Sequence, residues 1–183
     1  MKKIINMCDK LINQVMSLID NSYKDFGNKS KVIKPMRVIG KKYITIGKNV
    51  IINNGIRLEA IDKWLDETYD PEIIINDGVA IGQNCHITAA NRIFIGRGSS
   101  IMPDVLITDI EHMYIQGKSL SETNIEVGLV EIGEFVTIGM GARIIGHRKL
   151  HIGDNAVIGA NSVVTKDIPD NTVAVGVPAR IIK

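Results

Sequence analysis

The stretch Ile152-Gly-Asp-Asn-Ala-Val-Ile158-Gly-Ala-Asn-Ser-Val-Val164 places an aliphatic residue at every sixth position. A period of six fits neither an α-helix, which repeats about every 3.6 residues, nor a strand, which alternates at every second residue. It is typical of a chain that turns a corner after every six residues and directs one aliphatic side chain inward on each side. Three such sides close one triangular coil.

The same step of six recurs in four further segments. The aliphatic positions fall in five groups of three, at 46, 52 and 58; 75, 81 and 87; 95, 101 and 107; 132, 138 and 144; and 152, 158 and 164. Thirteen of these fifteen residues are Ile, so one kind of side chain fills one repeated slot. Repetition at a fixed period indicates a stacked architecture. The sequence therefore predicts a parallel β-helix of about five coils.

The insertions between the groups support this stacking. The steps from one group to the next are 17, 8, 25 and 8 residues, so every departure from six falls on the third side of its coil. In a stack whose coils rise by about 4.8 Å each, these insertions would gather at one corner of a prism. The two largest predict loops at about 59–72 and 108–131.

The composition agrees with a mainly β protein. The 183 residues include 33 Ile and 15 Val but only 8 Leu, and β-branched side chains pack well on pleated surfaces. This amount of apolar material excludes a disordered chain. No apolar run reaches about 18 residues, so no membrane span is expected. The net charge of +2 gives no basic field for nucleic acid.

The N-terminal segment has a different pattern. Apolar residues from Ile4 to Ile19 follow helical spacing, which predicts an amphipathic α-helix and connector over 1–34, ahead of the β-helix domain over 35–183. Asp9 interrupts the apolar stretch early and no small-residue cleavage site follows. We therefore expect no signal peptide and a cytoplasmic location. The two cysteines do not form a disulfide framework.

The C-terminal residues suggest a family. The segment from Ile152 to Lys183, which continues after Val164 as Thr-Lys-Asp-Ile-Pro-Asp-Asn-Thr-Val-Ala-Val-Gly-Val-Pro-Ala-Arg-Ile-Ile-Lys, resembles the end of the galactoside, maltose and polysaccharide O-acetyltransferases. With the six-residue pattern over about 37–183, the chain is similar to the hexapeptide-repeat acyltransferases. This resemblance implies a left-handed β-helix with an extruded loop. It also implies acetyl-CoA as acyl donor and a homotrimer with active sites between subunits.

The largest insertion carries the candidate base, in Thr108-Asp-Ile-Glu-His112. Long loops on rigid scaffolds often carry chemistry, and attack of a hydroxyl on a thioester needs a general base near neutral pH. The resemblance implies a base within an Asp-His-x-His or Asp-x-x-His element of this loop, although Ile110 stands where relatives often have His. His112 is therefore the predicted base, and Asp109 or Glu111 could orient it. The alternatives are a surface histidine and solvated carboxylates.

The resemblance also assigns a donor site along the C-terminal coils. The matched positions are Met140 and Ala160 for the pantetheine arm, and Thr165, Lys166 and Arg180 for the adenosine phosphates. Two of these are cations, which suit an anionic nucleotide, although solvated surface charges are the alternative. Gly139 and Gly159 would permit close backbone approach.

Three residues are candidates for binding the acceptor. His86 precedes an inward-facing Ile and should face outward, and Asn84 lies two places earlier and should do the same. Trp64, the only Trp, lies in the insertion at 59–72 and could stack on a sugar ring or form a subunit contact. Cys85 occupies an inward slot and is predicted to be a core thiol rather than a nucleophile.

The leading hypothesis is an acetyl-CoA-dependent O-acetyltransferase that acts on a hydroxyl of a sugar or polysaccharide precursor. Transfer would be direct, without a covalent intermediate. An N-acetyltransferase acting on an amino sugar and a non-catalytic trimeric scaffold are the alternatives. His147 and His151 have Arg148 and Lys149 between them, an environment that repels a cation, so no metal site is expected.

Overall fold

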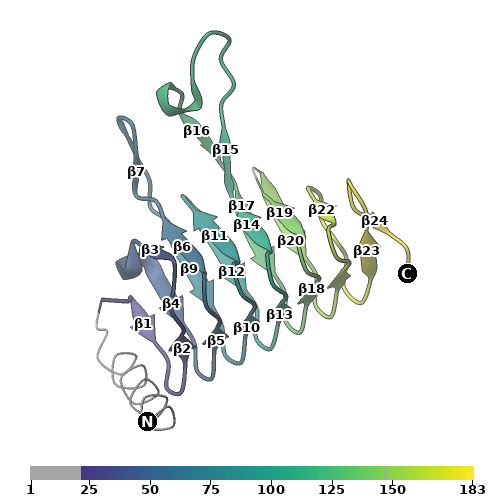
Figure 1. Ribbon diagram of the computed structural model, residues 1–183. Helices are drawn as coiled ribbons and strands as arrows, with labels where there is room; N and C mark the ends of the chain where they lie inside the picture. Colours follow the sequence, from purple (N-terminus) through teal and green to yellow (C-terminus); the bar gives the residue numbers. More distant parts are fainter. Residues whose placement is uncertain (1–21, 147) are drawn as a thin grey trace, which may run out of the picture.

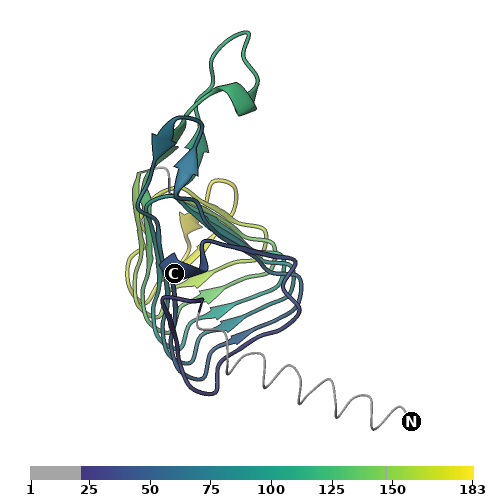
Figure 2. The same ribbon diagram turned by 90° about the vertical axis from the view of Figure 1, so that its left-hand side faces the viewer.

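The computed structural model describes residues 22–146 and 148–183, which form a left-handed parallel β-helix of triangular coils (Figure 1). Figure 2 looks along the stack and shows the coils closing around one narrow core. The predicted N-terminal helix and Cys8 lie outside the described residues, as does His147. No helix in the described part of the chain is both long enough and apolar enough to cross a bilayer.

Three sheets form the faces of the prism. The first contains β1 (Asp25–Phe26), β4 (Ile44–Ile46), β9 (Glu72–Ile75), β12 (Arg92–Ile95), β17 (Leu129–Ile132) and β20 (Lys149–Ile152). The second contains β2 (Lys31–Val32), β5 (Ile51–Ile52), β10 (Ala80–Ile81), β13 (Ser100–Ile101), β18 (Thr137–Ile138), β21 (Val157–Ile158), β23 (Val173–Val175) and β24 (Arg180–Ile181). The third contains β3 (Arg37–Ile39), β6 (Arg57–Ala60), β11 (His86–Ala89), β14 (Leu106–Thr108), β19 (Arg143–Ile145) and β22 (Val163–Val164). Strands of successive coils pair in parallel, apart from the terminal antiparallel pair β23–β24.

An isoleucine ladder confirms the predicted register. Ile46 pairs with Ile75, which pairs with Ile95, and the ladder continues through Ile132 to Ile152. All five side chains are fully buried. Complete burial of an aliphatic side chain of this size contributes about 1.5–3 kcal/mol, so the repeated slot is a main source of stability.

One coil precedes those that the sequence analysis identified. Strands β1, β2 and β3 pair with β4, β5 and β6, so this coil begins inside the segment 1–34 that was assigned to a helix and connector. Its core residues Phe26, Val32 and Val38 keep the step of six and pack, partly buried, against the core. A pattern based on Ile does not reveal this coil, because its slots hold Phe and Val.

The insertions gather at the corner between the third and first faces, as predicted (Figure 1). The first forms a hairpin of β7 (Lys63–Trp64) and β8 (Glu67–Thr68). The largest forms an antiparallel ribbon of β15 (Ile110–His112) and β16 (Ile125–Val127), whose tip contains the short 3-10 helix η2 (Leu120–Glu122). A second 3-10 helix, η1 (Lys41–Tyr43), turns the same corner in the first coil. The extruded loop is therefore an ordered ribbon on a rigid base.

Candidate active site

The third face carries the candidate site on its outer side. Successive residues of a strand point to opposite faces, so the neighbours of an inward residue point outward. Strand pairing places Arg57 beside His86, and Glu59 beside Thr88. The outward position predicted for His86 is confirmed by its contacts with both Glu59 and Thr88. Arg57, Glu59 and Thr88 were not predicted as site residues, although the same register places them on this outer side.

A cavity of about 410 Å³ lies between this face and the two extruded segments. The face contributes Arg57, Glu59, His86 and Thr88, among others. The extruded segments contribute Trp64 and His112. The cavity therefore brings together three of the predicted site residues: His86, Trp64 and His112.

Asn84 is exposed, as predicted, but it lies outside this cavity. It occupies the turn before β11 in a left-handed conformation with φ of 54°, and its side-chain amide donates to Asp104 Oδ1 at 3.3 Å. Asn tolerates this backbone conformation better than most residues, which explains its presence at the corner. It does not line the cavity where acceptor binding was predicted.

The hairpin and the ribbon hold His112 over the cavity. His112 lies opposite Ile125 in the ribbon, and its ring meets that of Trp64 edge-on, with 5.2 Å between ring centroids. The indole Nε1–H of Trp64 donates to the backbone oxygen of Thr123 at 2.9 Å. Asn124 Nδ2 also donates to Glu67 Oε1 at 2.6 Å. Two insertions that are distant in sequence therefore fix each other and the candidate base.

Asp109 has a structural role in place of the predicted orienting one. Its side chain is fully buried, and its two carboxylate oxygens accept the backbone N–H groups of Ala90 and Asn91, each at 2.9 Å. Burial raises the pKa of Asp109, and the backbone N–H donors only partly oppose this. The carboxylate holds the turn between β11 and β12, and its hydrogen bonds do not extend to His112.

Glu59 is the centre of a charged cluster in the cavity wall. Arg37 Nε lies 3.3 Å from Oε1, while Arg57 Nη2 and His86 Nε2 each lie 3.1 Å from Oε2. Glu59 is only 5% exposed. Burial acts to raise the pKa of Glu59, but the hydrogen bonds from Arg57 and His86 outweigh it and hold the pKa below its ordinary value. Glu59 is therefore ionised at neutral pH.

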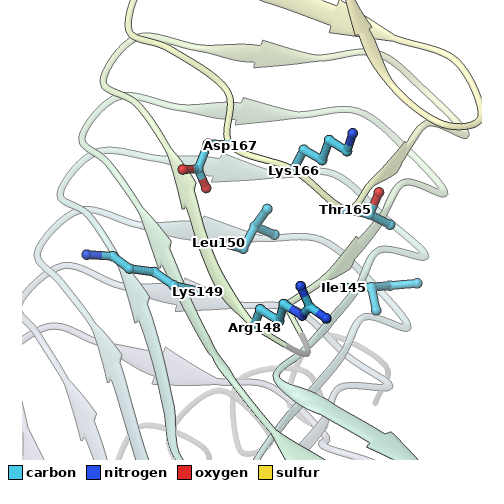
Figure 3. Close-up of a pocket in the computed structure, with 8 residues that line it drawn as sticks. Ile145, Arg148, Lys149, Leu150, Thr165, Lys166 and Asp167 are labelled. Atoms are coloured by element: carbon cyan, nitrogen blue, oxygen red, sulfur yellow. The ribbon is translucent and has the colours of Figure 1, made fainter.

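A second cavity, of about 620 Å³, lies at the same corner nearer the C-terminus. Its residue Ile145 pairs with Thr108 of the first cavity, so the two cavities adjoin through neighbouring strands. The second cavity contains Arg148, Lys149 and Lys166 but only one carboxylate, Asp167. Figure 3 shows Arg148 and Lys166 on the same side as Thr165, while Lys149 extends the opposite way. This excess of cations suits an anionic ligand.

The predicted donor residues are spread over separate places. Thr165 and Lys166 line the second cavity. Met140 and Ala160 lie at the corner between the second and third faces, and the Arg180 guanidinium in β24 donates to Ala179 O at 2.9 Å. Gly139 packs against the next coil, where a Cβ would stand 2.5 Å from the backbone nitrogen of Ala160. Contact between stacked coils is sufficient to require glycine at that position.

Cys85 is 1% exposed, which confirms the inward position predicted for it. Its Sγ–H donates to the backbone oxygen of Met102 at 3.2 Å. Burial raises the pKa of the Cys85 thiol, which keeps it protonated and makes it a poor nucleophile. Cys85 therefore belongs to the core.

Comparison with known proteins identifies relatives. The profile of a family described as hexapeptide repeat of succinyl-transferase matches residues 129–166. A putative lipopolysaccharide biosynthesis O-acetyl transferase of Escherichia coli K12 is 34% identical over 148 residues, which cover 76% of this chain and 71% of that protein. Galactoside O-acetyltransferase of the same strain is 31% identical over 159 residues, which cover 84% and 70%.

A solved structure supports the fold. The crystal structure of an N-acyltransferase from Bacillus cereus in complex with dTDP and 3-hydroxybutyryl-CoA matches with a TM-score of 0.75. The match covers 92% of this chain and 86% of the other, at 20% sequence identity. At that identity the likeness shows the architecture alone.

Proposed function

The chain belongs to the hexapeptide-repeat acyltransferases, and from this premise we propose that it transfers an acetyl group from acetyl-CoA to a hydroxyl of a sugar or polysaccharide precursor. One observation carries the proposal. The two extruded segments close over a cavity that contains both His112 and Trp64, and this cavity adjoins a basic one. The relatives named as O-acetyltransferases favour a hydroxyl acceptor.

His112 would act as the general base. Its imidazole takes the proton from the acceptor hydroxyl while the hydroxyl oxygen attacks the thioester carbon. The carbon–sulfur bond then breaks, and the departing thiolate receives the proton from the imidazolium. The products are an acetyl ester and free CoA, with no intermediate bound to the enzyme. A positioned base of this kind contributes about 10²- to 10⁴-fold to the rate.

The basic cavity would hold the nucleotide end of the donor. Lys166 and Arg148 come from neighbouring coils and lie on one side of this cavity, where phosphate groups can pair with both (Figure 3). Replacement of Lys166 by Gln should weaken CoA binding about tenfold, the loss of one charge-assisted contact. Calorimetry measures the affinity for CoA. The matched control is Lys48→Gln, because Lys48 is an exposed lysine outside both cavities. Equal affinities of the two variants would exclude this donor site.

The ribbon tip would contact another subunit of a homotrimer. Tyr114 is 84% exposed and Leu120 54% exposed, and Met113 and Ile115 lie beside Tyr114 on the same tip. Exposed apolar groups of this kind mark interaction sites. Light scattering should give three copies of the chain, and Tyr114→Ser should shift the distribution toward smaller species. A monomer that transfers acetyl groups at full rate would exclude a shared site.

The function is tested with a panel of acceptors. Thiol release from acetyl-CoA would be measured with neutral sugars, amino sugars and a water-only blank. We expect release with hydroxyl acceptors, and a product that hydroxylamine cleaves as an ester. A product stable to hydroxylamine, formed only with amino sugars, would favour amide formation. Absence of CoA binding by calorimetry would contradict both transfer to a hydroxyl and transfer to an amine.

A further inference from the structure

The wall of the first cavity contains a hydrogen-bonded acid–base pair that the proposed function does not use. His86 Nε2 lies 3.1 Å from Glu59 Oε2 and 2.5 Å from Thr88 Oγ1. The Thr88 hydroxyl also faces Glu59 Oε2, at 3.4 Å. By contrast, the His112 ring contacts the ring of Trp64, and no side-chain hydrogen bond from the described residues holds it. The carboxylate-held histidine of this site is therefore His86.

The contacts of His86 favour one of its two neutral tautomers. An ionised carboxylate only accepts hydrogen bonds, which favours an N–H at the nitrogen that faces Glu59. The Thr88 hydroxyl donates to Glu59 Oε2, so its oxygen is free to accept from the same N–H. In the neutral imidazole, Nδ1 is then the nitrogen without a proton, and it can accept a hydrogen bond. Within the described part of the chain no group donates to Nδ1, while the ring itself lines the cavity. A carboxylate that fixes one imidazole nitrogen commonly prepares the other for a ligand or a proton.

Glu59 is well held for such a role. It is nearly buried, and Arg37 and Arg57 approach it in addition to His86. The two guanidinium groups hold the carboxylate in one position. These two arginines already pair with both oxygens, so the position of the carboxylate does not depend on His86 alone. The histidine instead gains a fixed tautomer beside the acceptor cavity.

We propose that Glu59 is a positioning residue that holds His86 with Nδ1 available to the acceptor, so that His86 accepts a hydrogen bond from a second hydroxyl while His112 deprotonates the first. This inference rests on the proposed function. It narrows the substrate class to sugars with at least two free hydroxyl groups. An acceptor that lacks the second hydroxyl would leave Nδ1 unpaired in the complex and would bind less tightly.

The test combines acceptor kinetics with the tautomer of His86. Glu59→Gln should raise KM for a diol acceptor about tenfold with a smaller change in kcat, and should leave KM for the matching deoxy acceptor unchanged. Glu134→Gln removes a more exposed carboxylate, which also pairs with an arginine, Arg97 at 2.7 Å, outside both cavities. It should change neither value. Equal effects of Glu59→Gln on the diol and the deoxy acceptor would overturn the proposal.

Nitrogen-15 NMR of labelled histidine reads the tautomer directly, and His86→Gln assigns the signal. We expect the Nε2–H form of His86 in the native protein and a mixture in Glu59→Gln. Thr88→Val keeps the ion pairs of Glu59 and should shift the tautomer of His86 in the same direction by a smaller amount. This second variant keeps the test valid if the Glu59→Gln protein does not fold. A native His86 protonated on Nδ1 would overturn the proposal. Because the NMR measurement needs no turnover, it stands even if no sugar accepts an acetyl group.

Discussion

Trp64 should control the position of His112 although it takes no part in proton transfer. Trp64→Phe keeps an aromatic ring but removes the N–H that donates to the Thr123 carbonyl at 2.9 Å. Trp64→Ala removes the donor and also the edge contact with His112. Thr123 is 2% exposed, so its carbonyl would lose its partner where water has little access.

The contacts set the expected size of the effect. Loss of the partner of a buried polar group costs about 1–3 kcal/mol, and an aromatic pair contributes about 0.5–1.5 kcal/mol. Because about 1.4 kcal/mol corresponds to a factor of ten, Trp64→Phe should raise the open population of the ribbon about tenfold. Trp64→Ala should raise it about a hundredfold. Both effects are local, since the ribbon stands outside the stacked coils.

Amide hydrogen exchange measures this opening. Exchange in β15 and β16 should accelerate in the order native, Phe variant, Ala variant, while exchange in β12 stays unchanged. The value of kcat falls only in a variant whose open form makes up a large fraction of the molecules, because only then is the base out of place for much of the time. Leu65→Ala, on the same hairpin and 42% exposed, serves as a control. Unchanged exchange in the ribbon of the Ala variant would refute the role given to Trp64.

Three further predictions concern stability and reactivity. Ile95→Ala should lower the free energy of unfolding by about 2–5 kcal/mol in denaturant titrations because Ile95 is fully buried, whereas Ile51→Ala, 46% exposed, should cost much less; similar costs would contradict the assigned register. In a Cys8→Ser background, a disulfide reagent should modify Cys85 only after unfolding, since the thiol is buried with a raised pKa; rapid reaction of the native protein would contradict this. The pKa of Glu59 is lowered in the folded protein, so its contribution to stability is present above the unfolded pKa of about 4.3 and is lost as the pH falls through the lower folded value. The free energy of unfolding of Glu59→Gln should therefore fall less than that of the native protein between about pH 5 and 3. Parallel plots of unfolding free energy against pH for the two proteins would refute this role of Glu59.

The fold could be predicted because one geometric rule repeats along the chain. The step of six fixed the inward slots, and the position of each insertion fixed the common corner. The first coil was not predicted because its inward slots hold Phe26, Val32 and Val38 in place of Ile. This coil packs against only one described neighbouring coil, so its slots can accept different side chains.

The site could be predicted only where single residues stand out. His112 and Trp64 were found because each is an unusual residue in an insertion, but their mutual contact depends on how two distant segments meet. The partners of Glu59 come from three successive coils, so they are too far apart in sequence to form a recognisable motif. Asp109 looked like an orienting group beside His112 in sequence. Its strand position instead turns the carboxylate inward to the backbone of the preceding coil.

The role of His112 as the base is tested most directly by the rate of acetyl transfer in His112→Ala. With a saturating sugar acceptor, thiol release should fall by about 10²- to 10⁴-fold. Binding of CoA, measured by calorimetry on the same preparation, should stay within about twofold of native because His112 does not line the donor cavity. Transfer at the native rate by a folded His112→Ala protein would contradict the account.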